Sequence, residues 1–268
     1  MLYSVNGALV RQQALTVTAA ILDNRGCILS SGTDQISTVS GGLDNAQNGL
    51  IDSGATLPLN AMALGNIGGM MKAQQDLSVN GTSLDNGSGN LAGKGAVILN
   101  LLGILTNTGG KLASAGPLLI QQASQLNSQS GQIVSQSLMT LLIGGLDNSQ
   151  TGTLAASGPL VLNASGAVLN NDDGLIYSQS ADVQQHAAGL ANATGTVQSQ
   201  DTLALTLTGD LDNQMGRLIA QNNDLLLSAG NVDNRGGLLS ILTGVVSAWL
   251  SGMLNNGQGG IVQGQSLD

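Results

Sequence analysis

A short motif recurs along the chain with a period of about 21 residues. Its clearest copy runs from Leu211 to Ile219: an apolar residue, Asp, Asn, two variable positions, Gly, one more variable position and an apolar pair. A fixed period of this length over nearly a whole chain is typical of stacked repeats, and it constrains the fold more than any single motif does. We count twelve copies, which open at Leu22, Leu43, Ile67, Leu84, Leu105, Leu126, Leu146, Leu169, Leu190, Leu211, Val232 and Leu254.

The position two residues after each opening apolar residue is Asn in ten copies. Asn tolerates the left-handed backbone region better than most residues. The sequence therefore predicts a structural corner with positive φ at Asn24, Asn45, Asn86, Asn107, Asn148, Asn171, Asn192, Asn213, Asn234 and Asn256. Ser128 and Gly69 occupy this position in the other two copies.

The residues around this corner also indicate turns. The residue before it is Asp in six copies, and Asp side chains accept hydrogen bonds from their own turn. Gly stands five residues after the opening apolar residue in eight copies, which suggests a second corner. Cys27 takes that glycine position in the first copy, so we interpret it as a drifted corner residue rather than a nucleophile.

Short alternating runs follow the corners, such as Thr202–Leu207 and Ala14–Thr18. Alternation with period two indicates half-buried strands. A repeat unit of this length with two or three such runs is one coil of a parallel β-helix. A leucine-rich repeat of similar length needs helix formers, but the chain has no Glu and only three Lys. The predicted fold class is therefore all-β, a solenoid of about twelve coils.

We expect residues 1–268 to form a single continuous array with an irregular coil at 67–83, where the copy is short and lacks the Asp-Asn pair. Strands stacked about 4.8 Å apart would make a rod roughly 55–60 Å long. The aliphatic composition, with no Phe and one Trp, suits a narrow interior. The array begins and stops partway through a coil, without the polar capping units that solenoids need. We therefore expect the chain to be a fragment of a longer one, with terminal coils that fray or associate end to end.

Composition and single residues argue against several functions. The net charge of −9 disfavours nucleic acid and a polybasic membrane site. The lone His186 has no catalytic partners in the sequence and is expected to be an exposed strand residue. We expect no catalytic residue, no cofactor and no metal. The pairs Asp172/Asp173 and Asp210/Asp212 lack the nine-residue calcium-binding repeat, so turn chemistry is favoured for them.

The stretch from Leu238 to Leu254 has no charged residue. A membrane-spanning segment is one interpretation, but the stretch is shorter than the roughly 20 residues that a span needs. It also contains Gly244 and Gly252 and lies in register between two motif copies. The favoured interpretation is one leucine-rich coil of the solenoid, without a transmembrane segment.

The repeated unit Leu-Asp-Asn-x-x-Gly-x-Leu, best preserved at residues 22–31, 211–230 and 232–240, resembles the filamentous haemagglutinin repeats of Gram-negative two-partner-secretion exoproteins. That family includes adhesins, haemolysins and the stalks of contact-dependent growth inhibition toxins. The resemblance implies a right-handed parallel β-helix, export through an outer-membrane transporter, and release or display at the cell surface.

The predicted function is a non-enzymatic structural or adhesive stalk segment, with an unknown receptor on a host or neighbouring cell. Two alternatives remain open. One is a receptor-binding or translocation segment of a growth inhibition toxin, which flanking sequence would reveal. The other is a carbohydrate-active β-helix, which a sugar-degradation assay would reveal, although the chain lacks Glu and aromatic platforms for sugars.

Overall fold

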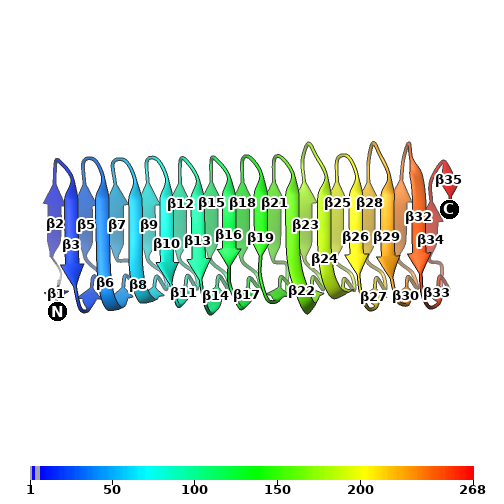
Figure 1. The fold of residues 1–268 in the computed structure, drawn as a ribbon, viewed down its shortest axis with the longest axis horizontal. Helices are drawn as coiled ribbons and strands as arrows, with labels where there is room; N and C mark the ends of the chain where they lie inside the picture. Colours follow the sequence, from blue (N-terminus) through cyan, green and yellow to red (C-terminus); the bar gives the residue numbers. More distant parts are fainter. Residues whose placement is uncertain (1, 4–6) are drawn as a thin grey trace. The chain divides into compact units, whose positions relative to one another are not determined.

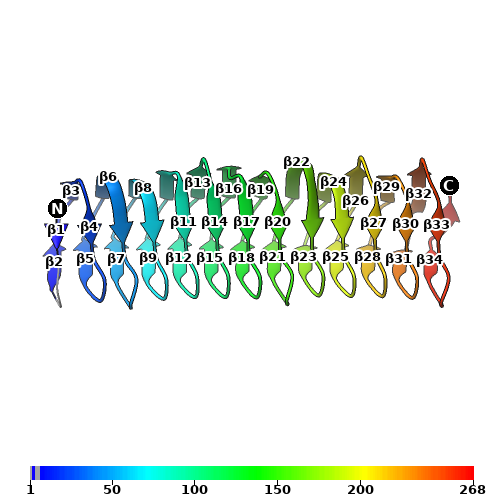
Figure 2. The same ribbon diagram turned by 90° about the horizontal axis from the view of Figure 1, so that it is seen from below.

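The computed structural model describes residues 2–3 and 7–268, and this part of the chain contains strands and turns but no helix. Its internal contacts divide it into two compact units. Unit 1 comprises Met1–Asn127 and Gly131–Ser137, and unit 2 comprises Ser128–Ser130 and Leu138–Asp268. Each unit is a stack of coils, and the strands of successive coils lie side by side (Figures 1 and 2).

A representative coil of unit 1 contains three strands: β12 (Asn90–Gly93), β13 (Val97–Leu101) and β14 (Ile104–Thr106). Each strand pairs in parallel with the equivalent strand of the next coil, so that Leu91 lies beside Leu112 and Leu99 beside Ile120. In several coils the second and third strands merge into one long bent strand. The all-β solenoid of about twelve turns that the sequence predicts is therefore confirmed.

Unit 1 contributes its strands to two faces. The first face consists of β2 (Ala8–Arg11), β5 (Ile28–Ser31), β7 (Leu50–Ser53), β9 (Met70–Ala73), β12, β15 (Lys111–Ser114) and β18 (Gln132–Ser135). The remaining strands are β1 (Leu2–Tyr3), β3 (Leu15–Ala19), β4 (Leu22–Asp23), β6 (Gln35–Asp44), β8 (Leu57–Gly65), β10 (Leu77–Gly81), β11 (Ser83–Asp85), β13, β14, β16 (Leu118–Gln122) and β17 (Gln125–Asn127).

Unit 2 repeats this arrangement. The first face consists of β21 (Thr153–Ala156), β23 (Leu175–Ser178), β25 (Thr196–Ser199), β28 (Arg217–Ala220), β31 (Leu238–Ile241) and β34 (Ile261–Gln263). The other strands are β19 (Met139–Leu142), β20 (Leu146–Asp147), β22 (Leu160–Asn170), β24 (Val183–Ala191), β26 (Leu203–Leu207), β27 (Leu211–Asp212), β29 (Leu225–Ala229), β30 (Val232–Asp233), β32 (Val245–Leu250), β33 (Leu254–Asn255) and β35 (Ser266–Leu267).

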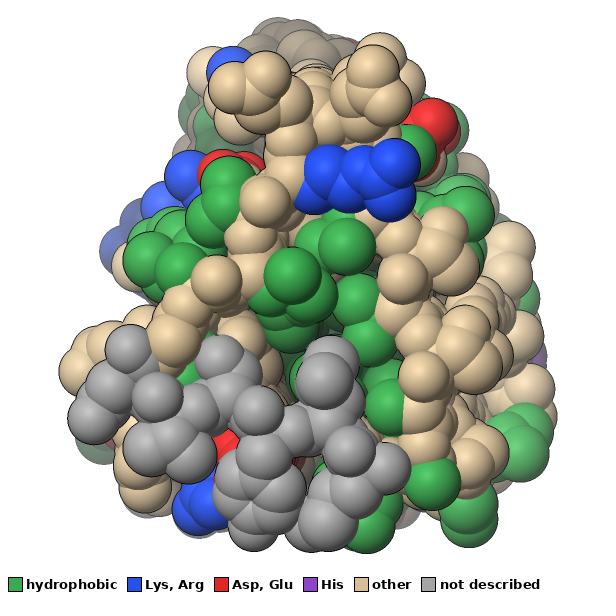
Figure 3. All heavy atoms as spheres, turned by 90° about the vertical axis from the view of Figure 1, so that its left-hand side faces the viewer, with side chains coloured by type: hydrophobic (Ala, Val, Ile, Leu, Met, Phe, Trp, Pro, Cys, Tyr) green, Lys and Arg blue, Asp and Glu red, His purple; other side chains and the backbone are tan. Residues whose placement is uncertain are grey.

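Aliphatic columns fill the interior of each unit. Along a strand, every second side chain turns inward, so β12 buries Leu91 and β13 buries Val97, Leu99 and Leu101. Because the strands are parallel and in register, each inward residue stacks on its equivalent in the next coil. Seen from the N-terminal end, hydrophobic side chains are visible in the middle of the view, enclosed by backbone and other side chains, and further hydrophobic side chains lie at its edge (Figure 3).

The coil that the sequence analysis placed at Ile67 is regular, and its predicted register is wrong by three residues. The coil opens at Leu64, which pairs with Leu43 on one side and Leu84 on the other. Gly65 takes the aspartate position, and Asn66 takes the asparagine position. With this start, the spacings to the coils before and after it match those in the rest of the chain. Residues 67–83 are therefore not irregular, because β9 and β10 pair with both neighbouring coils.

Several inward-facing side chains are polar, and three of them lack a hydrogen-bond partner among the described residues. Gln35 and Ser37 face the interior of unit 1 from β6, and Gln185 faces the interior of unit 2 from β24. All three are at most 2 % exposed, and within the part of the chain that the structure describes their side-chain polar atoms have no hydrogen-bond partner. Gln35 lies in register with Leu15 of the preceding coil, so an amide occupies a place that other coils of unit 1 give to leucine or valine.

Candidate functional site: the asparagine column

The most regular polar feature of the chain is a column of buried asparagines, one at the end of each third strand. In unit 1 it contains Asn24, Asn45, Asn66, Asn86 and Asn107, and in unit 2 it contains Ser128, Asn148, Asn171, Asn192, Asn213, Asn234 and Asn256. Every member is fully buried except Asn256, which is exposed. The structure therefore places all ten asparagines that the sequence singled out, together with Asn66, in one type of position.

Hydrogen bonds between side chains join these asparagines. The Nδ2 group of Asn213 donates to Oδ1 of Asn234 at 2.7 Å, and Oδ1 of Asn213 accepts from Nδ2 of Asn192 at 2.8 Å. The same Nδ2 group also lies within hydrogen-bond distance of the backbone carbonyls of Gly216 and Leu238. Each amide thus ties its own turn to the next coil. Equivalent bonds of 2.6 to 2.8 Å link successive asparagines in both units.

The predicted positive φ at these asparagines is wrong. Positive φ falls two residues later in each turn, as at Gly26, Ser88, Thr194 and Met215. The turn runs from the asparagine carbonyl to an N–H three residues on, so the positive φ lies at its third residue, as in a type II turn. Asn is present here because a carboxamide both donates and accepts, and a column of such groups can satisfy itself without water.

Three copies carry one extra residue in this turn, at residues 45–49, 148–152 and 256–260. In the first of them, Gly49 N–H donates to the carbonyl of Ala46 rather than to that of Asn45. Gln47 and Asn48 both have positive φ, the pattern of a type I′ turn. The extra residue is absorbed in the turn, so the strands on either side keep their register.

The glycine at the end of this turn is required for space. An added Cβ at Gly49 would lie 2.6 Å from the carbonyl oxygens of Asn24 and Asn45. Of the eight glycines that suggested a second corner, only Gly259 has positive φ. For the glycines that end the turn the requirement is space, because two coils approach each other closely there. Cys27 lies in the same position, as predicted, and is 1 % exposed.

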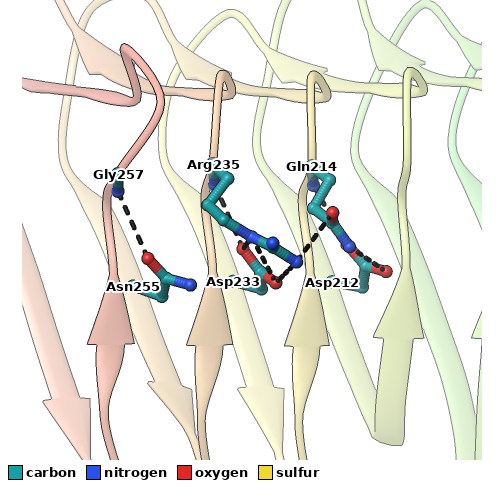
Figure 4. A network of polar contacts seen from close by, with 6 residues as sticks. All are labelled: Asp212, Gln214, Asp233, Arg235, Asn255 and Gly257. Atoms are coloured by element: carbon teal, nitrogen blue, oxygen red, sulfur yellow. Dashed lines mark hydrogen bonds and ion pairs between the residues drawn. The ribbon is translucent and has the colours of Figure 1, made fainter.

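A column of carboxylates flanks the asparagines. Asp212 Oδ1 accepts from the backbone N–H of Gln214 at 3.0 Å, and Asp233 Oδ1 does the same for Arg235 at 3.2 Å. Arg235 also donates to Asp233 through its side chain and to Gln214 Oε1 of the preceding coil at 2.9 Å. Figure 4 shows these bonds running along and between neighbouring turns of unit 2.

These contacts change the acidity of two carboxyl groups. The Arg235 guanidinium, which hydrogen-bonds to Asp233, lowers the pKa of that carboxyl below its ordinary value. In unit 1 the Arg25 side chain lowers the pKa of Asp23 in the same way, and the ion pair measures 2.6 Å. The Nε atom of Arg25 also lies 3.4 Å from Oδ2 of Asp44 in the next coil. The carboxylates of this column are thus occupied by turn and inter-coil contacts.

The other candidates from the sequence have structural settings. His186 is exposed on β24, as predicted. The side chains of Asp172 and Asp210 accept backbone N–H groups of the next coil, from Ala193 and Asn231 at 2.7 Å. Asp173 hydrogen-bonds to Thr194. These bonds join successive coils, and none of the three lies within the turn to which its aspartate belongs.

The uncharged stretch 238–254 forms strands β31 and β32, in register with their neighbours. Within the part of the chain that the structure describes, no helix is long and apolar enough to cross a membrane.

The sequence model of one protein family, the haemagglutinin repeat, matches residues 2–47, 35–109, 113–176, 174–214 and 216–248. The chain belongs to the haemagglutinin repeat family. These repeats are an adhesin-type structural family, typical of secreted or surface-exposed proteins. No curated protein and no solved structure matches the chain. In this chain, each haemagglutinin repeat is one coil. The Asn and Asp side chains of its turns form hydrogen bonds that hold it to the next coil.

Proposed function

We propose that this chain is a non-enzymatic stalk segment of a large exoprotein of a Gram-negative bacterium, exported through an outer-membrane transporter and displayed at the cell surface or released. Membership of the haemagglutinin repeat family supports this proposal. Within each unit the coils act as a spacer, and any adhesive contact is made by outward-facing side chains.

The asparagine column is the observation that carries the proposal. Each coil presents donors that the next coil accepts, as Asn86 does for Asn107 at 2.8 Å and for the carbonyl of Lys111 at 3.1 Å. Every coil is therefore a nearly equivalent building block, and coils can be added without a new kind of contact. In a solenoid, the free energy of unfolding is approximately the sum of the contacts between neighbouring coils. Such a structure can be lengthened by adding coils, as a spacer requires.

The local nature of these contacts also suits export. Each strand pairs with the equivalent strand of the neighbouring coil, so one coil can stack on the previous one as the chain emerges. The chain has a single Cys, so its folding does not depend on an internal disulfide. These features support passage in an unfolded form followed by coil-by-coil assembly outside the cell.

Deletion of whole coils tests the spacer function. The full chain is fused between an outer-membrane anchor and an epitope tag, and the height of the tag above the membrane is measured by fluorescence interference. Removing residues 43–104, which are three coils, should lower the tag by about 14 Å if strands stack about 4.8 Å apart. The protein should still reach the surface and resist protease.

The control deletes residues 43–94, which is not a whole number of coils. This variant should lose protease resistance, since the asparagine column and the aliphatic columns no longer align across the junction. An unchanged tag height after the three-coil deletion, or equal protease resistance of both variants, would contradict the proposed function.

A further inference from the structure

The three lysines of this acidic chain converge on one hollow of unit 1. The sequence contains three Lys against a net charge of −9. Lys72, Lys94 and Lys111 all line a single hollow of about 330 Å³ on the outer face of strands β9, β12, β15 and β18. We name it the lysine hollow.

Two alanines form the floor of the lysine hollow. Strand register places Lys72 beside Ala92, and it places Ala113 beside Val134. Ala92 and Ala113 are themselves register partners. The outward-facing side chains along this column are therefore Lys72, Ala92, Ala113 and Val134. Because the two alanine side chains are only methyl groups, the space between Lys72 and Val134 stays open.

The cations reach this floor from different positions on the coils. Lys72 lies within β9, Lys111 opens β15, and Lys94 directly follows β12 at the opposite end of the strands. Lys72 forms an ion pair with Asp52 at 3.5 Å. Lys94 and Lys111 are exposed and form no ion pair with the described residues.

We propose that the lysine hollow is a docking site for an acidic segment of a partner protein. Carboxylates of that segment pair with Lys94 and Lys111, and a small aliphatic side chain between them rests on Ala92 and Ala113. Lysine suits this arrangement because its ammonium forms charge-assisted hydrogen bonds while its apolar stem covers the floor. The proposal does not depend on the stalk function.

The chemistry of the hollow favours a protein over other anionic partners. Nucleic acid and anionic membranes engage surfaces much larger than a hollow of about 330 Å³ with two exposed cations. The lining has no aromatic side chain on which a sugar ring could stack. The ammonium groups of Lys94 and Lys111 can bind acidic side chains, and the methyl groups of Ala92 and Ala113 can contact an aliphatic one. A peptide segment in which acidic and aliphatic residues alternate offers both.

Binding of a synthetic peptide to the full chain tests the proposal. The probe is a fluorescent, acetylated peptide of alternating Asp and Val, and its matched control carries Asn in place of Asp. Fluorescence anisotropy should detect binding of the Asp peptide at low salt. Binding should disappear near 1 M salt, where the Debye screening length is only about 3 Å. Equal binding of the Asn peptide would overturn the proposal.

Variants locate the site. The double variant Lys94→Ala/Lys111→Ala should weaken binding by about tenfold, since each exposed ion pair contributes a factor of up to about five. The matched control Arg11→Ala/Arg217→Ala removes two exposed cations elsewhere and should leave the affinity within about twofold. Arg217 opens β28 as Lys111 opens β15, so the two substitutions are made in equivalent positions.

A third variant separates shape from charge. Ala92→Leu fills the floor on the outer face without altering the charge, and it should abolish peptide binding while thermal unfolding is unchanged. If Lys94→Ala/Lys111→Ala and Arg11→Ala/Arg217→Ala lowered the affinity for the peptide equally, the lysine hollow would not be the binding site. A sulfated polysaccharide that displaces the peptide and binds more tightly, with the same dependence on Lys94 and Lys111, would overturn the assignment to a protein partner.

Discussion

Replacing Asn213 by Gly separates two explanations of the asparagine column. If the residue served only to permit a left-handed backbone, Gly would be a mild substitution. In the structure, the side chain accepts one hydrogen bond from Asn192 and donates to Asn234, and all three residues are fully buried. We therefore expect Asn213→Gly to be about as damaging as Asn213→Ala.

The size of the loss follows from these contacts. Each hydrogen bond removed contributes about 1 kcal/mol, and a buried partner left unsatisfied costs about 1–3 kcal/mol more. Two bonds between side chains of neighbouring coils are lost, together with the longer contact to the Leu238 carbonyl, and Oδ1 of Asn234 loses its donor. The free energy of unfolding should fall by about 3–5 kcal/mol, which lowers the urea midpoint by more than about 1 M.

Urea unfolding of the full chain, followed by far-ultraviolet circular dichroism, measures this change. The matched control is Asn222→Gly, an exposed asparagine whose Nδ2 lies 3.4 Å from Asp201; its effect should stay within about 0.5 kcal/mol. An Asn213→Gly variant as stable as the wild type, together with a strongly destabilised Asn213→Val, would refute the hydrogen-bond explanation and restore the backbone one.

Three further predictions concern other positions. Gln35→Leu should raise the free energy of unfolding by about 1–3 kcal/mol, because it replaces a buried, unsatisfied amide with the residue type that fills the column; a loss in urea stability would show that the amide has a partner. Gly216→Ala should lower it by about 1–3 kcal/mol, since the added Cβ overlaps the carbonyl oxygen of Asn192; wild-type stability would show that the coils separate easily. The depressed pKa of Asp233 stabilises the fold fully above the unfolded-state value of about 3.9, and this stabilisation is lost as pH falls through the lower folded-state pKa. Arg235→Ala should therefore flatten the fall in stability below pH about 4, and an unchanged acid limb would contradict the assigned cause.

The coil architecture could be predicted from the sequence because the Leu-Asp-Asn spacing repeats with little drift. Cys27 could also be placed correctly, since the residues on both sides of it match the motif. The copy at Leu64 was misplaced because Gly65 replaces Asp, while Ile67 and Gly69 imitate the start of a motif. The unusual shortness of the misplaced copy, beside an unusually long one before it, was the signal of the error.

The role of the asparagines was harder to predict, since both a left-handed backbone and a buried amide column favour Asn. With Asn66 in place, the position contains Asn or Ser in every copy and never Gly. A position that needed positive φ would accept Gly readily. The lysine hollow could not be seen at all in the sequence, because Lys72, Lys94 and Lys111 come together only through the strand register.

Hydrogen exchange of the asparagine side-chain amides, measured by NMR on the full chain, tests the central claim most directly. The claim is that these amides are buried and bonded from coil to coil. The Nδ2 protons of Asn45, Asn86, Asn192 and Asn213 should exchange orders of magnitude more slowly than those of exposed Asn222, as buried hydrogen-bonded groups do. Exchange of the column amides at the rate of Asn222 would contradict the account.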